Sequence, residues 1–167
     1  AIEIDPRQPS AYVGRGGAYV RSGETAENLA AAQADYEAAV ALDDTLAEAY
    51  LGLADVYIRQ GDYDRALEIL RQGLEKTGEN REISDKIDEI DAGNISDSSG
   101  NVRRTTGYDG GGAIQYWHDF TYNARGQQDS VTSYDAAGNQ TGHLDLTYNE
   151  AGQPLLSYSS MGNTGEV

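Results

Sequence analysis

The chain has 167 residues, which is room for one ordinary domain or two small ones. It carries 28 acidic and 12 basic side chains, and this net charge of −16 repels nucleic-acid phosphates and anionic lipid surfaces. The absence of cysteine excludes disulfides, thiolate metal sites and a cysteine nucleophile, and no apolar run approaches the roughly 18 residues of a membrane span.

The first half of the chain is predicted to repeat a pair of helices. Residues 47–57 place apolar side chains three and four apart, a Gly-Asp break follows, and residues 63–75 resume the same spacing. The same order stands upstream: Tyr12 and Tyr50 are 38 positions apart in the first helices, and residues 36 and 70 are 34 apart in the second. The first interval exceeds the second by four residues, about one helical turn. Self-similarity of this kind is typical of helical repeat proteins.

This segment resembles the tetratricopeptide repeat, a helix–turn–helix unit with a period of about 34 residues. The matching positions are Tyr50, Leu53, Ala54 and Tyr57 in the first helix and Gly61, Tyr63, Ala66, Leu70 and Gly73 in the turn and second helix. The departures from the family are Arg15 at a usual Leu, Gly73 at a usual Ala, and Asp44 and Gly78 at the closing Pro. The resemblance covers residues 1–78. Because residues 1–6 resemble the last turn of a preceding repeat, we expect the chain to be a fragment.

A closing helix is predicted over residues 81–91. Asn80 is a suitable N-cap, and Ile83, Ile87 and Ile90 follow at positions i, i+4 and i+7 with charged residues on the opposite face. The open end of a solenoid needs such a half-polar helix. Residues 1–92 are therefore predicted to form an α-solenoid that ends in a capping helix.

The composition changes after residue 92. Residues 93–101 are polar and show no periodicity, which is typical of a linker. Residues 102–167 are rich in Gly, Ser, Thr, Tyr, Asn and Gln, and apolar residues alternate along parts of them, which indicates strands. The predicted fold class is therefore α+β, with two modules: the α-solenoid, the linker and an antiparallel β-meander.

The strand region contains four turns of the form Tyr-(Asp/Asn)-x-x-Gly. We predict five or six strands and a positive φ angle at the four closing glycines, Gly112, Gly126, Gly138 and Gly152. The pattern resembles YD (RHS-type) repeats, which are common in bacterial surface and secreted proteins. That resemblance implies an extracytoplasmic or cell-surface location in a bacterium, with a cytoplasmic location left open.

One face of the predicted meander is fairly apolar and needs a cover, since a single sheet must bury such a face. The closing helix, a curled edge of the sheet and a second copy of the chain are three possible covers. The oligomeric state is left open. The residues of this face are Tyr116, Phe120, Tyr122, Leu144, Leu146 and Tyr148.

No catalytic, cofactor or metal site is predicted. His118 is next to Asp119, but neighbours on a strand point to opposite faces and form no relay. Gly110–Gly112 has no Lys and helix after it, as a phosphate loop would. The chain is predicted not to be an enzyme.

The family resemblance implies a concave groove lined by the first helix of each repeat, here by Ser10, Val13, Gly17, Val20, Arg21, Glu48, Leu51, Asp55, Ile58 and Arg59. Exposed apolar side chains beside Asp and Arg suit a neutral to basic, partly apolar protein segment. The family's variant that clamps acidic tails uses Lys and Asn, where this chain has Val, Leu, Gly and Asp. Alternatively, the β-module or further repeats fill this groove.

Two functions are compatible with these patterns. The first is a non-enzymatic protein–protein interaction module whose groove binds a partner peptide or protein segment. The alternative is a bacterial surface protein that binds glycan or cell wall through its Tyr-rich meander, where aromatic rings offer a stacking platform. The identity of the partner is left open.

Overall fold

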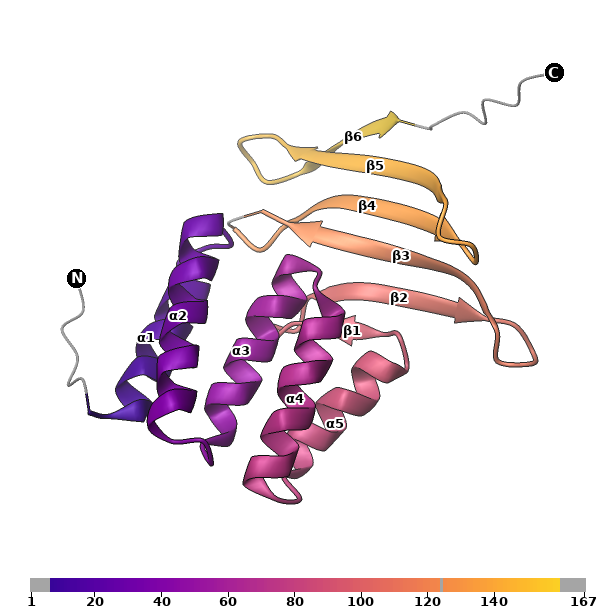
Figure 1. The fold of residues 1–167 in the computed structure, drawn as a ribbon. Helices are drawn as coiled ribbons and strands as arrows, with labels where there is room; N and C mark the ends of the chain where they lie inside the picture. Colours follow the sequence, from indigo (N-terminus) through magenta and orange to yellow (C-terminus); the bar gives the residue numbers. More distant parts are fainter. Residues whose placement is uncertain (1–6, 124, 160–167) are drawn as a thin grey trace.

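A computed structural model describes residues 7–123 and 125–159 of the protein, and this part consists of helices followed by strands (Figure 1). The helices are α1 (Pro9–Arg21), α2 (Ala26–Leu42), α3 (Ala47–Gln60), α4 (Tyr63–Thr77) and α5 (Arg81–Asp91). The strands are β1 (Ile95–Ser96), β2 (Val102–Tyr108), β3 (Ile114–Tyr122), β4 (Gln128–Asp135), β5 (Gln140–Tyr148) and β6 (Pro154–Ser159). The predicted fold class is confirmed. The supposed last turn of a preceding repeat, residues 1–6, and the end of the β-module, residues 160–167, lie outside the described residues.

Side-chain caps begin three of the helices. The Thr25 hydroxyl accepts a hydrogen bond from the backbone N–H of Asn28, and the Asp62 carboxylate accepts one from Arg65. Asn80 caps α5 in the same way, with Oδ1 3.1 Å from the backbone nitrogen of Ile83. The predicted closing helix and its cap are therefore confirmed. None of the helices in the described ranges has the length and apolar character that crossing a membrane requires.

Small residues let the helices approach closely. The Tyr36 ring of α2 lies close to Gly16 of α1 and packs against Gly52 of α3, where a Cβ atom would collide with it. A Cβ at Gly73 of α4 would lie 2.6 Å from Cγ of Tyr50, a side chain that is 1 % exposed. Interiors packed to this density leave no room for one more carbon, so glycine is required at these contacts.

The strands form one antiparallel sheet in the order β1-β2-β3-β4-β5-β6, as expected of a meander. The four closing glycines, 112, 126, 138 and 152, have φ angles of 82°, 73°, 85° and 75°. In each turn the glycine N–H donates to the carbonyl of the Asp or Asn three residues earlier. The prediction of left-handed glycines is confirmed.

The segment 93–101 differs from the linker that its composition suggests. It contains β1 and a fifth turn of the same kind, in which Gly100 has a φ of 81° and donates to the Asp97 carbonyl at 2.9 Å. Sequence analysis missed this turn because Ser96 stands where the other turns have tyrosine. The first residues of the five turns follow at alternating intervals of 12 and 14: Asp97, Asp109, Asn123, Asp135 and Asn149.

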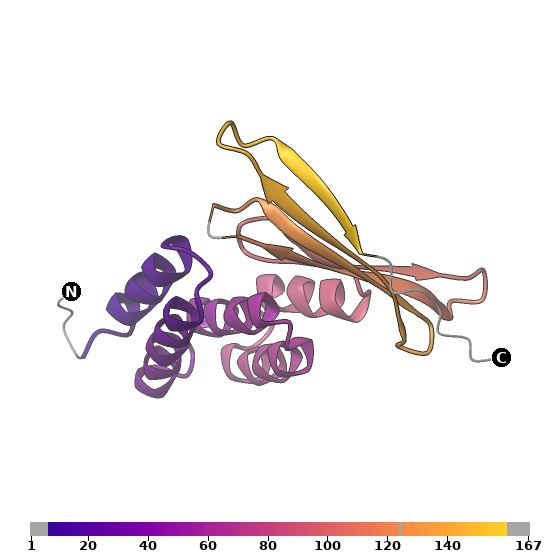
Figure 2. The ribbon, with the colours of Figure 1, turned by 90° about the horizontal axis from the view of Figure 1, so that it is seen from above.

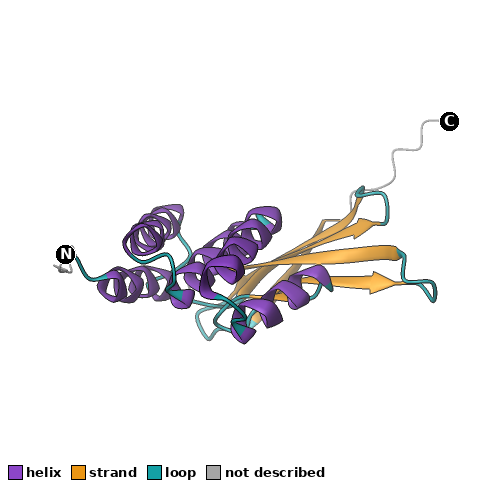
Figure 3. Ribbon diagram, turned by 60° about the horizontal axis from the view of Figure 1, so that its bottom comes forward, coloured by secondary structure: helices purple, strands orange, loops and turns teal. Residues whose placement is uncertain are grey.

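The helices lie on one side of the sheet, and the strands form a single layer that extends beyond them (Figures 2 and 3). On that side, the Arg104 guanidinium lies 4.6 Å from the centroid of the Tyr63 ring and forms a bidentate ion pair with Asp119. Burial raises the pKa of Tyr63 to about 12, with the nearby charge of Asp119 adding to the effect. The sheet is thus joined to the start of α4 by aromatic and charged contacts.

Of the three covers considered for the predicted apolar face, the closing helix is ruled out for Tyr116 and Phe120. Tyr122 of that predicted face lies instead on the side of the helices, 4.8 Å from the Arg103 guanidinium, because the register of β3 shifts after Thr121. Trp117 lies on the same face as Arg104 and Asp119, and strand residues alternate between faces, so Tyr116 and Phe120 lie on the outer face. Tyr116 is 51 % exposed. The ion pair and the tyrosine contact of Arg104 select the more polar face for the helices.

Candidate functional site

The predicted groove residues lie on α1 and α3, but only part of them is accessible. Arg21 and Glu48 are exposed, as is Ser10, whereas Val13, Gly17 and Leu51 are partly buried. Val20 is 8 % exposed, Asp55 7 % and Ile58 1 %, and the Arg59 side chain is 3 % exposed. The expectation that Val20 and Ile58 are exposed is therefore wrong. The groove is open at the N-terminal halves of the two helices, whereas toward their C-terminal ends Arg21 stays exposed and Val20, Asp55, Ile58 and Arg59 are covered.

The turn between β1 and β2 closes that half of the groove. Ser98 donates to the Asp55 carboxylate twice, from its backbone nitrogen at 2.6 Å and from its hydroxyl at 2.9 Å. Arg59 donates from Nη2 to the Ser99 hydroxyl at 2.8 Å. The β-module thus fills this end of the groove, which agrees with the alternative that the β-module, rather than a partner, occupies it.

A buried cluster of charges holds the two modules together at this point. Arg59 lies 2.8 Å from Asp55 and 3.4 Å from Asp97, and Arg103 of β2 lies 2.6 Å from Asp97. Glu24, from the loop between α1 and α2, pairs with both arginines. The cluster links the loop between α1 and α2 and the helix α3 to the turn after β1 and to β2.

The pKa of Asp97 reflects this arrangement of charges. Burial alone would raise it, but the hydrogen bond from Arg103 and the charge of Arg59 outweigh burial and hold the pKa below its usual value. Burial alone would lower the pKa of Arg59, but the carboxylates of Asp55, Asp97 and Glu24 together outweigh burial and hold the pKa above its usual value. Asp97 thus pairs with both buried arginines, and removing it weakens the charge compensation of each of them.

A cavity of about 460 Å³ lies beside this cluster, between the C-terminal end of α1 and the sheet. Val20, Arg21 and Arg59, three of the predicted groove residues, line it together. Sequence analysis missed the residues that the β-module contributes, because the docking of a sheet turn on a helix end leaves no local pattern. The alternating turn spacing is the one signal in the sequence, since it indicates that the turns at 97 and 123 lie at the same end of the sheet. The cavity residues that the β-module contributes are Ser99, Asn101, Asn123, Arg125 and Gly126.

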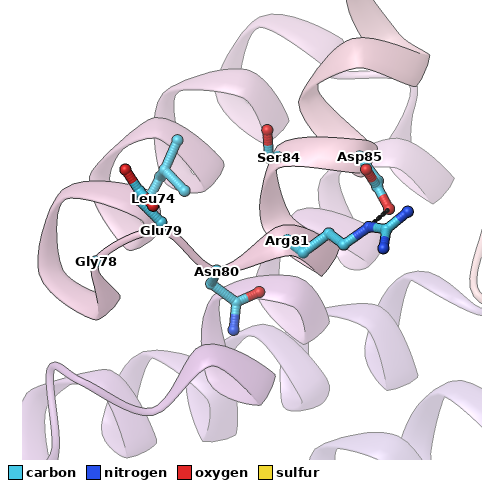
Figure 4. Close-up of a pocket in the computed structure, with 7 residues that line it drawn as sticks. All are labelled: Leu74, Gly78, Glu79, Asn80, Arg81, Ser84 and Asp85. Carbon is cyan, nitrogen blue, oxygen red and sulfur yellow. Dashed lines mark ion pairs between the residues drawn. The ribbon is translucent and has the colours of Figure 1, made fainter.

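Two further hollows do not bring together side chains from both the helices and the sheet. One of about 610 Å³ lies at the turn between α4 and α5 (Figure 4), where Arg81 pairs with Asp85 at 3.6 Å. The other, of about 550 Å³, lies on the outer face of the sheet, where Nδ1 of His118 is 2.9 Å from the Ser133 hydroxyl. Within residues 7–123 and 125–159, no three acidic or histidine side chains are grouped as a metal site requires.

The fold and this site define a helical-repeat scaffold joined to a β-meander. Residues 25–86, which run from the start of α2 into α5, match the family model described as tetratricopeptide repeat. The match supports the resemblance for the helices. It ends before the sheet, so the likeness of the strands to YD repeats stays a prediction.

Two curated proteins are similar to half of the chain. Hsp70-Hsp90 organizing protein 2 of Arabidopsis thaliana is 32 % identical over 87 residues, and Hsp70-Hsp90 organizing protein 1 of Glycine max is 33 % identical over 87 residues. Each match covers 52 % of this chain and 14 % of the relative. The chain therefore spans about one seventh of the length of these relatives.

Proposed function

We propose that the chain is a non-enzymatic protein-interaction module and that a partner segment binds the open half of the groove. The observation that carries the proposal is the uncovered surface of α1 and α3. There, Val13 and Leu51 are only partly buried and Glu48 is exposed without an ion pair in the described part of the chain. This surface offers apolar contacts together with one negative charge.

The chemistry of this surface defines the partner. Val13 and Leu51 suit one or two apolar anchors, which supply most of the energy at such sites. Glu48 and the net charge of −16 favour a neutral to basic segment over an acidic tail in this half. The relatives are named as organizing proteins of Hsp70 and Hsp90, and this supports a protein, rather than a small molecule, as the partner.

The test is a calorimetric titration with peptides selected from a library on the full chain. Leu51→Glu should weaken binding at least tenfold, because it places a charge on an apolar contact, a loss of about 1.4 kcal/mol or more. Leu42→Glu is the matched control, since Leu42 is 48 % exposed at the end of α2 and lies outside the groove. Equal affinities of the two variants, or selection of acidic tails that bind over Leu51, would contradict the proposal.

A second candidate function uses the outer face of the sheet. The rings of Tyr116 and His118 are 5.3 Å apart between centroids, and those of His118 and Phe120 are 6.5 Å apart. Such a row of rings suits stacking on a glycan or cell-wall polymer, and this alternative would go with a location at a bacterial surface. A glycan array separates the two functions: a signal that Tyr116→Ala abolishes and Tyr108→Ala retains would favour the alternative.

A further inference from the structure

Almost every cation of this acidic chain is already paired within it. From Arg15 onward, across the part of the chain that the structure describes, nine lysines and arginines pair with a carboxylate of the same chain. Over the same stretch, only Arg21 and Arg125 make no ion pair. Because the chain has 28 carboxylates for 12 cations, two unpaired arginines are an unusual feature of its surface.

Both unpaired arginines line the same 460 Å³ cavity. Arg21 is the last residue of α1, and Arg125 lies in the turn between β3 and β4. The folding of the sheet onto the helices therefore brings together two free guanidinium groups that are distant in sequence. This hollow is called the arginine cavity below.

The charge of the arginine cavity is opposite to that of the whole chain. Its lining contains Arg21, Arg59 and Arg125 against one carboxylate, that of Glu24. Glu24 is engaged by Arg59 and Arg103, so it does not pair with either free guanidinium. A positive cavity in a molecule of net charge −16 attracts an anion locally, although the molecule as a whole repels it.

We propose that the arginine cavity binds an oxyanion, a carboxylate or a phosphate group, that a partner protein presents. Guanidinium groups donate paired hydrogen bonds in a planar geometry that matches both groups. The volume lies within the range of roughly 300–1,000 Å³ that is usual for sites of small ligands. Val20 adds an apolar wall, so a side chain or a chain terminus fits better than a free ion.

This inference rests on the proposed function in one respect only: the partner segment of that proposal is the molecule that carries the oxyanion. Val13 and Arg21 are eight residues apart on α1, which is about 12 Å along the helix. An extended peptide spans that length in about four residues. A segment whose apolar anchor contacts Val13 therefore reaches the arginine cavity with an anionic residue about four positions away.

The test observes the two guanidinium groups directly, by nuclear magnetic resonance of the arginine Nε–H groups in the full chain. Sodium glutarate and inorganic phosphate are titrated separately, with sodium chloride at equal ionic strength as the reference. The Arg21 and Arg125 signals should shift and saturate with at least one of the two oxyanions and not with chloride. Tighter binding of glutarate assigns a carboxylate on the partner, and tighter binding of phosphate assigns a phosphorylated residue.

Variants establish the site. Arg21→Gln and Arg125→Gln should each weaken oxyanion binding about tenfold, since each removes one charge-assisted contact. Arg71→Gln is the matched control, because Arg71 is an exposed arginine that pairs with Asp91 on the helices. Shifts that stay linear, or an equal effect of Arg71→Gln, would overturn the inference. Glutarate and phosphate do not contact Leu51, so failure here leaves the peptide titration as a separate test of the proposed function.

Discussion

At the scale of single residues, the fold depends on the places where a side chain is missing. Gly52 and Gly73 each face an aromatic ring at a distance that admits no Cβ atom, and Gly16 faces one at a distance that would be tight for it. The sequence shows small residues at these positions, and the family pattern predicts close helix packing there. Which ring fills each gap follows from the structure, because Tyr36 and Tyr50 belong to helices that the sequence alone does not orient.

We predict that Gly73→Ala destabilises the protein. The new Cβ would lie 2.6 Å from the Tyr50 ring, which is held at its other end by a 3.1 Å hydrogen bond from its hydroxyl to the Asp44 carbonyl. Overpacking of this kind costs about 1–3 kcal/mol. Urea unfolding of the purified variant measures the loss.

Gly14→Ala is the matched control for this substitution. Gly14 also lies within a helix, α1, but no atom lies within 4 Å of a Cβ built there. Alanine should then stabilise by roughly 0.5–1 kcal/mol, the usual advantage over glycine inside a helix. If both variants gained stability, the close approach of α4 to Tyr50 would not exist in solution.

At the scale of elements, the turns show which features a local sequence pattern predicts and which it does not. Periodicity predicted four of the five turns, their glycines and the helix over residues 81–91, and the structure confirms them. The turn at Asp97–Gly100 has the same hydrogen bonds, but its Ser96 hid it within a polar stretch. Its function in the fold is set by contacts with Asp55 and Arg59 on α3, over 35 residues away, which no local pattern contains.

We predict that Asp97→Asn destabilises the whole protein at neutral pH. Asp97 has a lowered pKa in the folded state, so its contribution is complete above its unfolded pKa, near 4, and is lost as the pH falls through the folded value. Removing one partner of a buried ion cluster costs about 3–5 kcal/mol. Urea unfolding between pH 7 and pH 2 measures the effect.

The control and the pH profile make this prediction specific. Asp88→Asn, at an exposed position of α5, should change stability at neutral pH by less than about 0.5 kcal/mol. The gap between the chain with Asp97 and Asp97→Asn should narrow as the pH falls below 4. A gap that stays constant down to pH 2 would show that the loss does not come from the charge.

At the scale of the whole molecule, the chain fills half of its own groove. The helices, their order and the meander were predictable, because each has a period of its own. The docking was not predictable, because it depends on which sheet face finds partners among the helices. On the docked face Arg104 pairs with Asp119 while its guanidinium lies over Tyr63, and Tyr116 and Phe120 of the predicted apolar face remain outside.

The same docking divides the predicted groove residues into two sets. Asp55, Ile58 and Arg59 serve the joint between the modules, whereas Val13 and Leu51 remain available to a partner. The joint also creates the arginine cavity, which neither module has alone. A partner should therefore recognise the joined molecule, and its binding should not require the turn at Asp97 to leave α3.

Hydrogen–deuterium exchange of the full chain, with and without a selected peptide, tests this account most directly. We expect slower exchange in residues 10–17 and 47–52, at the open half of the groove, and no faster exchange in residues 97–103, because the turn at Asp97 stays docked on α3. Faster exchange in residues 97–103 on binding would show that the peptide displaces the turn and takes the closed half. Protection confined to β3, β4 and β5 would contradict the groove as the binding surface.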